Sequence, residues 1–241
     1  MNMLKLIFRR ETAMPLFALT FASGVSVALV LARIVWTGNL RYGFLIWNLF
    51  LAWLPLLFSL LAYDKFRHGA KERNWRFIGL TAAWLLFLPN APYIFTDLIH
   101  LTTRYYNHFW VDLMLVLSCA LTGLVLAFVS LYLMQSLVMR MFGRLISWFF
   151  IAGVAGLSSF GIYLGRFLRF NSWDVFFQPV KLYHGIGNWA AAPLTHSTSF
   201  AFPALFATFF FIAYVMLYGL THLQLASPIG MPRRTEQPGE A

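Results

Sequence analysis

The chain has 241 residues, of which 60% are hydrophobic and 11% are charged, and its mean hydropathy is +0.70. This composition excludes a water-soluble globular protein, because too few polar residues are present to cover its surface. The formal net charge of +10 does not indicate nucleic-acid binding, since the basic residues stand singly or in short clusters between hydrophobic runs.

Six uncharged or nearly uncharged runs are long enough to cross a hydrocarbon core of about 30 Å at about 1.5 Å per residue. Backbone amides in lipid need partners within their own segment, and the runs are too long for barrel strands. We therefore predict an all-α fold, a polytopic transmembrane helical bundle of about six spanning helices in a single domain over residues 1–225. The predicted spans lie near residues 12–33, 42–63, 77–99, 111–137, 145–165 and 199–222, with a disordered cytoplasmic tail at 226–241.

Lys and Arg residues distinguish the two sides of the predicted membrane. They are more frequent beside the two termini and in the loops on the same side, above all in loop 64–76, than in the loops on the other side. Positively charged loops stay in the cytoplasm, so this bias predicts that both termini are cytoplasmic.

The motif Pro89-Asn90-Ala91-Pro92 interrupts the third predicted span. The two prolines remove amides that would bond the carbonyls near Leu85 and Leu88, and a freed carbonyl in lipid needs another donor. The side chain of Asn90 is the natural candidate. A true break at Leu88 would leave residues 77–88 too short to span, so we expect a kinked but continuous helix.

Strongly polar residues gather at the outer ends of the predicted spans, and we expect them to form one outward-facing polar cluster, with residues 88–101 as one wall and Asp112 and residues 166–174 as the others. Asp97 and Asp112 flank a short outer turn and are expected at similar depth, while Arg166 and Arg169 end the fifth span one turn apart. Opposite charges at one membrane level tend to pair. Steps of three and four residues place four further polar positions on one face of a helix: Asn90, Tyr93, Asp97 and His100.

Two features are expected near the end of the fifth span. Gly161 and Gly165 are four residues apart, which allows close helix packing, and we favour packing within the chain over dimerisation. The segment beyond predicts a short interfacial helix on the outer side, with Asn171 as its cap, Asp174 three residues later and its end near Pro179. Its apolar face would carry Trp173, Phe176, Phe177 and Val180.

The roles of these residues stay open. Asp112 can simply complement the dipole of its helix, and Asp97 can form a structural ion pair with Arg166 or Arg169. The alternatives are acid–base catalysis and capture of a phosphate or an anionic lipid headgroup. No metal or cofactor is expected, since no HxxxH or HExxH spacing supports a metal site from Asp97, His100 and Asp112 with His184. The catalytic candidates are Asp97, His100 and Asp112, and the ligand-binding candidates are Asn90, Tyr93, Arg166, Arg169, Asn171 and Asp174.

Three stretches carry a resemblance to a known family: LFLPNAPYIFTDLIHL, FWVDLMLVLSCALTGLVLAFVSLYL and GIYLGRFLRFNSWDVF. Over roughly Asn48–Pro179 the chain resembles the bacterial membrane family named domain of unknown function 1361. The resemblance implies a multi-pass bacterial membrane protein and implies no activity. We expect the protein in the bacterial cytoplasmic (inner) membrane. The motif residues are Pro89, Asn90, Pro92, Tyr93, Asp97, Asp112, Gly165, Arg166, Asn171, Trp173 and Asp174.

Three classes of function follow from this pattern. The favoured one is a structural or partner-binding membrane component whose charges hold helices together. The alternatives are an extracytoplasmic-facing enzyme acting on a lipid-linked or phosphate-bearing substrate, and a small-solute transporter with the proline motif as its hinge. Paired charges favour the first class, and unpaired charges in an open cleft favour the enzyme. The expected partners are the lipid bilayer and either an anionic lipid or another membrane protein, with no nucleic acid.

Overall fold

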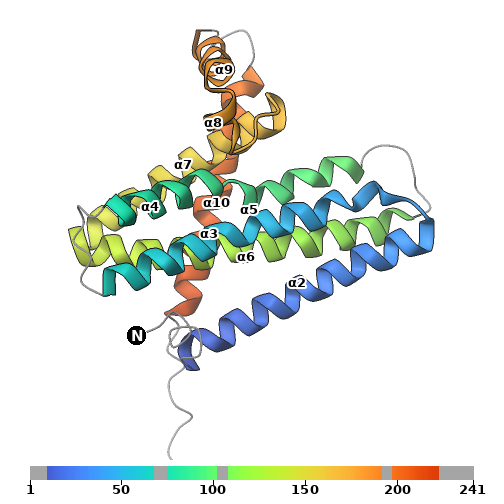
Figure 1. The fold of residues 1–241 in the computed structure, drawn as a ribbon, viewed down its shortest axis with the longest axis horizontal. Helices are drawn as coiled ribbons and strands as arrows, with labels where there is room; N and C mark the ends of the chain where they lie inside the picture. Colours follow the sequence, from blue (N-terminus) through green and yellow to red (C-terminus); the bar gives the residue numbers. More distant parts are fainter. Residues whose placement is uncertain (1–9, 68–74, 102–107, 192–196, 223–241) are drawn as a thin grey trace, which may run out of the picture.

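The computed structural model of the protein describes residues 10–67, 75–101, 108–191 and 197–222 (Figure 1). Within these ranges the chain is helical and contains no strand, which confirms the predicted all-α fold. The elements are α2 (Arg10–Thr37), η1 (Leu40–Tyr42), α3 (Phe44–Arg67), α4 (Trp75–Phe87), α5 (Asn90–Tyr93), η2 (Ile94–Leu101), α6 (Phe109–Phe142), α7 (Arg144–Phe167), α8 (Asp174–Phe177), α9 (Pro179–Ala191) and α10 (Ser197–Thr221).

Six helical segments of the described chain are long and apolar enough to cross a membrane. Each corresponds to one of the predicted spans, because a long uncharged run is a property of the local sequence and survives into the fold. The predicted tail at residues 226–241 lies outside the described residues. The segments are Ala13–Thr37, Leu40–Arg67, Trp75–Ile99, Phe109–Phe142, Arg144–Phe167 and Phe200–Thr221.

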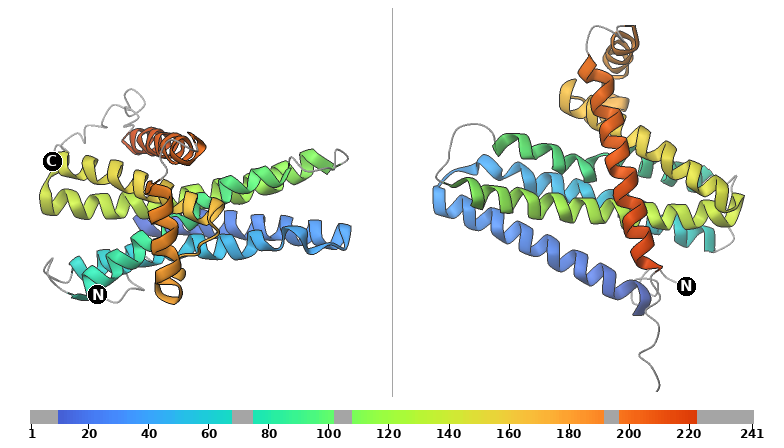
Figure 2. Two further views of the ribbon diagram at one scale, coloured as in Figure 1. Left: turned by 90° about the horizontal axis from the view of Figure 1, so that it is seen from above. Right: turned by 180° about the vertical axis from the view of Figure 1, so that it is seen from behind.

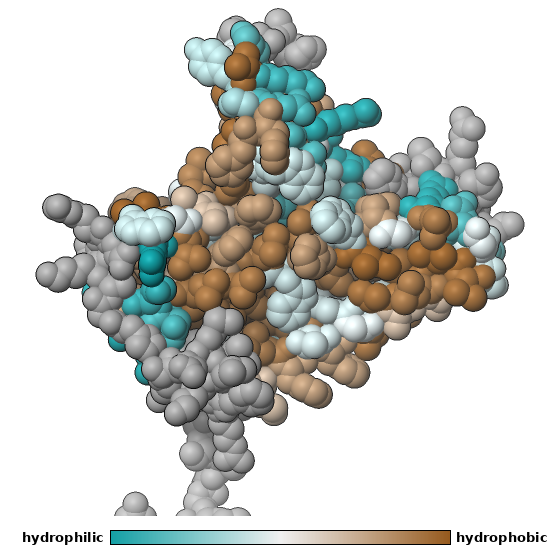
Figure 3. Space-filling view, in the orientation of Figure 1, coloured by the Kyte–Doolittle hydropathy of each residue, from teal (hydrophilic) through white to brown (hydrophobic). Residues whose placement is uncertain are grey.

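The spans are not all parallel. Helices α2, α3 and α6 and the segment from α4 to η2 run alongside one another, whereas α7 diverges from them toward α8 and α9 (Figure 1). Helix α10 crosses α6 and α7 at a steep angle on the far side of the bundle (Figure 2). The face seen in Figure 3 is hydrophobic over most of the bundle and hydrophilic near its ends and around α9, as expected for a protein surrounded by lipid.

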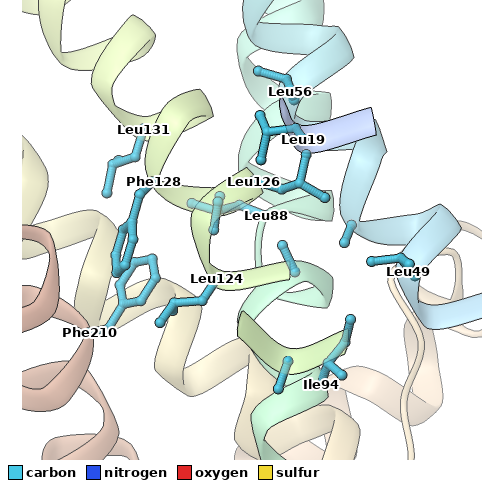
Figure 4. Close-up of a cluster of buried hydrophobic side chains, with 14 of the residues drawn as sticks. Leu19, Leu49, Leu56, Leu88, Ile94, Leu124, Leu126, Phe128, Leu131 and Phe210 are labelled. Atoms are coloured by element: carbon cyan, nitrogen blue, oxygen red, sulfur yellow. The ribbon is translucent and has the colours of Figure 1, made fainter. Parts of the chain in front are cut away.

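Helix α6 is the centre of the core. It packs against α2, α3, α7 and the segment from α5 to η2, and its buried side chains include Leu124, Leu126 and Leu131. Figure 4 shows these residues in one cluster with apolar side chains of α2, α3, the turn after α4, η2 and α10: Leu19, Leu49, Leu56, Leu88, Ile94 and Phe210. Hydroxyl groups add polar links inside the bundle, since Ser26 Oγ of α2 lies 3.0 Å from Ser118 Oγ of α6. Such short polar contacts suit helix pairs in lipid, where water does not compete.

The third span is interrupted more strongly than we predicted. Helix α4 ends at Phe87, Leu88 and Pro89 form a turn, and the chain continues as the short α5 and the 3-10 helix η2. The expectation of one kinked, continuous α-helix is therefore wrong. The span is completed all the same, because α5 and η2 continue in the general direction of α4 (Figure 1).

The outer segment after α7 contains two short helices instead of one. Helix α8 ends at Phe177, and Pro179 begins α9 instead of ending the segment. Proline suits a first helical position because its missing N–H has no partner there in any helix. The predicted cap is also wrong: Asp174 Oδ2 accepts a hydrogen bond of 2.6 Å from the backbone N–H of Asn171, and the side chain of Asn171 caps no helix.

Candidate functional site

Asp97 is the most deeply buried charged residue of the candidate set, with 2% of its surface exposed. Arg166 Nη1, at the end of α7, donates to its Oδ1 over 3.2 Å, and Asn48 Nδ2 of α3 donates to its Oδ2 over 3.0 Å. The predicted pairing of Asp97 with Arg166 is confirmed. Both carboxylate oxygens are thus bound by donors from two other spans, which ties η2 to α3 and α7.

Asp112 belongs to a separate cluster at the start of α6. Arg33 donates to it twice, from Nε over 2.6 Å and from Nη2 over 3.2 Å, and the Tyr42 hydroxyl donates over 3.0 Å. A bidentate guanidinium–carboxylate pair is among the strongest side-chain contacts. It joins α6 to α2 and η1.

The expectation that Asp97 and Asp112 share one cluster is wrong. Asn48, the partner of Asp97, follows Tyr42, the partner of Asp112, by about two turns, or about 9 Å of helix. Arg33 is not among the candidate residues identified from the sequence. The sequence does contain a signal for the Arg33–Asp112 pair, because Arg33 ends the first span and Asp112 begins the fourth span on the same side of the predicted membrane.

A cavity of about 1060 Å³ lies beside the Asp97 cluster. Its walls come from α3, α4, α5, η2, α7, the segment after α7 and α9, so it is formed by parts of the chain far apart in sequence. Six of the predicted or newly identified polar residues line it, together with Asp97 itself: Asn48, Asn90, Tyr93, Arg166, Asn171 and Ser172. Asp112 is not among the lining residues.

The interrupted third span, from α4 to η2, forms part of the cavity wall. Side-chain hydrogen bonds hold its interruption in place. Asn90 Nδ2 donates to the carbonyl of Phe87 over 3.0 Å and to Ser172 Oγ over 2.9 Å. Ser172 in turn donates to the carbonyl of Leu86 over 3.0 Å. As expected, Asn90 bonds a backbone carbonyl at the interruption. The acceptor is Phe87, however, and not Leu85 or Leu88, whose α-helical donors the two prolines remove. Sequence analysis missed Ser172, because a serine in a polar loop gives no sign of which distant carbonyl it reaches.

Glycines let neighbouring helices approach the proline motif closely. A Cβ on Gly161 of α7 would lie 2.7 Å from the ring of Pro89, and one on Gly165 would lie 3.2 Å from the ring of Tyr93. A Cβ atom essentially never lies as close as 2.7 Å to another heavy atom, so a side chain at Gly161 would force the two segments apart. The Gly161–Gly165 pair therefore packs within the chain, as we expected from the sequence.

The remaining candidates lie elsewhere. Arg169 is exposed, has a left-handed backbone with φ of 59°, and has no hydrogen bond or ion pair to another described residue. Asp174 is buried but bonds the backbone of Asn171. His184 Nδ1 lies 2.9 Å from the carbonyl of Val180 on exposed α9. The side chain of His100 lies outside the described part, within which no cluster of three potential metal-ligating residues occurs.

A family model described as "Protein of unknown function (DUF1361)" matches residues 47–223, which is well over half of the chain. The chain belongs to the DUF1361 family. No curated protein and no solved structure matches it. The whole Asp97 cluster of the DUF1361 protein lies inside the matched region, whereas Arg33 and Tyr42, which bind Asp112, precede it. The family description assigns no reaction or ligand, so function must be argued from the geometry.

Proposed function

We propose that the DUF1361 protein is a non-catalytic, partner-binding membrane component whose buried charges hold its helices together. The observation that carries this proposal is the pairing of two buried carboxylates with arginines: Asp97 binds Arg166 and Asn48, and Asp112 binds Arg33 and Tyr42. A general base needs a carboxylate within reach of a substrate proton. Carboxylates whose oxygens are already held by protein donors suit a structural role better.

One observation favours a second candidate, an extracytoplasmic-facing enzyme acting on a lipid-linked substrate. Asp97 lies in the wall of a cavity large enough for a substantial ligand. In such an enzyme Asp97 would act on the substrate while Arg166 held its anion. A transporter has less support, because the polar residues of the cavity wall belong to the outer half of the third span and its neighbours.

A double-mutant cycle at Asp97 and Arg166 separates the two candidates. Arg166→Gln should lower the free energy of unfolding by about 3–5 kcal/mol, because it removes the guanidinium that lies 3.2 Å from the buried Asp97 carboxylate. Combining Arg166→Gln with Asp97→Asn should restore a large part of this loss, since no charge is then stranded. Thermal or denaturant unfolding in detergent micelles measures both effects.

Arg169→Gln is the matched control, since Arg169 is exposed and has no described partner, and we expect a change within about 0.5 kcal/mol. Full stability of the single variants at Asp97 and Arg166 would contradict the structural role. It would instead favour the enzyme, whose catalytic groups are not optimised for stability.

We further propose that the protein spans a bacterial cytoplasmic membrane with its N- and C-termini in the cytoplasm. The support is the excess of Lys and Arg beside the termini and in loop 64–76. In a Cys119→Ala background, a cysteine at position 104 should react with a membrane-impermeant maleimide in intact cells, and one at position 71 only after permeabilisation. Labelling of both positions from one side would refute this orientation.

A further inference from the structure

The cavity beside Asp97 changes character along its length. From Gly79 to Phe87, its α4 wall consists of small and apolar side chains, and α7 contributes Leu157 and Phe160 opposite. This wall is about 12 Å long, close to the thickness of one hydrocarbon leaflet of about 15 Å. The next part of the same span, from Asn90 to Asp97, forms the polar end. One cavity thus has the polarity profile of an amphiphile.

The apolar part of the cavity faces the surrounding lipid. Gly79, Ala82 and Leu157 line it and are exposed residues of the described chain. Exposed apolar residues on a membrane-spanning helix contact acyl chains. A lipid molecule can therefore enter this cavity sideways, with its chain along α4 and its headgroup toward Asp97.

The charges at the polar end balance one another. Among the described lining residues, Asp97 and Arg166 are the charged ones, and they are paired at 3.2 Å. An anionic headgroup would add an uncompensated negative charge next to Asp97 in a low-dielectric site, which is costly. A headgroup that carries one positive and one negative charge adds no net charge and can align its dipole with that of the pair.

Some polar groups of the wall are still available to a ligand. The hydroxyl of Tyr93, the side-chain oxygen of Asn90 and the Nε and Nη2 atoms of Arg166 make no hydrogen bond to another described residue, although all three residues line the cavity. Guanidinium N–H groups are the preferred donors for phosphate. The tyrosine hydroxyl adds a further donor for a headgroup oxygen.

We propose that this cavity binds one zwitterionic phospholipid, with its phosphate at Arg166 and Tyr93 and an acyl chain between α4 and α7. The volume of about 1060 Å³ is at the upper end of the range for ligand pockets, roughly 300–1,000 Å³. This inference rests on the proposed non-catalytic, partner-binding role and names the partner. It revises the expectation of an anionic lipid, because Arg166 is neutralised by Asp97 and Arg169 does not reach the cavity.

The test uses the purified full-length protein in vesicles made of equal parts phosphatidylethanolamine, phosphatidylglycerol and an uncharged diacyl glycolipid. After mild detergent extraction and washing, the retained lipids are quantified by mass spectrometry. We expect phosphatidylethanolamine to be enriched at least about five-fold over its share in the vesicles. Enrichment of phosphatidylglycerol or of the glycolipid, or the absence of enrichment, would overturn the proposal.

Two variants connect the retained lipid to this cavity. Ala82→Trp fills the apolar part and should abolish the enrichment, whereas the control Ala152→Trp, at an exposed α7 position that lines no described cavity, should preserve it. Tyr93→Phe removes only an oxygen without a described protein partner, so it should lower retention a few-fold at an unchanged melting temperature. Equal retention by the wild type and both cavity variants would overturn the proposal.

The lipid-retention experiment and the double-mutant cycle at Asp97 and Arg166 test different claims. If that cycle behaves as expected and no lipid is enriched, only the lipid assignment fails. If the cycle fails and the retained lipid is chemically altered in the wild type but intact in Asp97→Asn, the non-catalytic role fails and the lipid assignment fails with it, because the cavity would then hold a substrate.

Discussion

Arg33→Gln will destabilise the folded protein by about 3–5 kcal/mol, although Arg33 lies outside the region matched by the family model. The substitution removes both hydrogen bonds that the guanidinium donates to Asp112 and leaves a carboxylate whose side chain is only 11% exposed. The Tyr42 hydroxyl, at 3.0 Å, is a neutral donor and cannot compensate the charge. Unfolding in detergent micelles, followed by circular dichroism, measures the loss.

The physical cause of this loss can be checked with a second substitution. In Arg33→Gln combined with Asp112→Asn, no charge is stranded, so stability should recover by more than half. Arg144→Gln is the control, because Arg144 is an exposed arginine at the start of α7 with no described side-chain partner. If Arg33→Gln costs no more than this control, the pair does not hold α2 to α6.

Gly123→Ala should also destabilise the folded protein, because the proline motif packs directly on the backbone of α6. A Cβ at Gly123 would lie 2.6 Å from the carbonyl oxygen of Ala91 and 2.9 Å from Cδ1 of Ile94. The carbonyl belongs to the helical backbone and cannot rotate away as a side chain does. We expect a loss of about 1–3 kcal/mol in the free energy of unfolding.

Gly153→Ala is the matched control for this substitution. Gly153 is also a helical glycine, but a Cβ there would meet nothing within 4 Å. Its replacement should leave stability unchanged or raise it by up to about 1 kcal/mol, because alanine favours the helix more than glycine. Equal effects of the two substitutions would mean that α5 can move away from α6 without cost.

Sequence reasoning succeeded where a polar group in a long apolar span has few possible partners. Asn90 was expected to bond a carbonyl at the interruption, and it does, although its acceptor is Phe87 and not Leu85 or Leu88, whose donors the prolines remove. Asp97 and Arg166 were expected to meet because both belong to the outer ends of long apolar spans, and they do. In each case a polar group in lipid has few possible partners, so a short list can be written from the sequence.

Sequence reasoning failed where the contact between two side chains depends on how their helices are rotated and tilted. Asp112 was grouped with Asp97, yet its partner Arg33 comes from α2, and Ser172 reaches the carbonyl of Leu86 from a loop far along the chain. Arg169, one turn from Arg166, points away from the cavity because the chain has already left the helix and turned through a left-handed residue.

The sequence by itself determined that this is a helical membrane protein, where its spans lie and which residues interrupt the third one. These properties depend on hydrophobic length and on proline chemistry, which act within one segment. Only the tertiary structure decided which arginine each aspartate binds, that the cavity exists, and that Asp97 and Arg166 are the charged residues among its described lining. Those properties arise from side-chain packing between helices, and the apolar surface of a span does not by itself specify its rotation, its tilt or its neighbour.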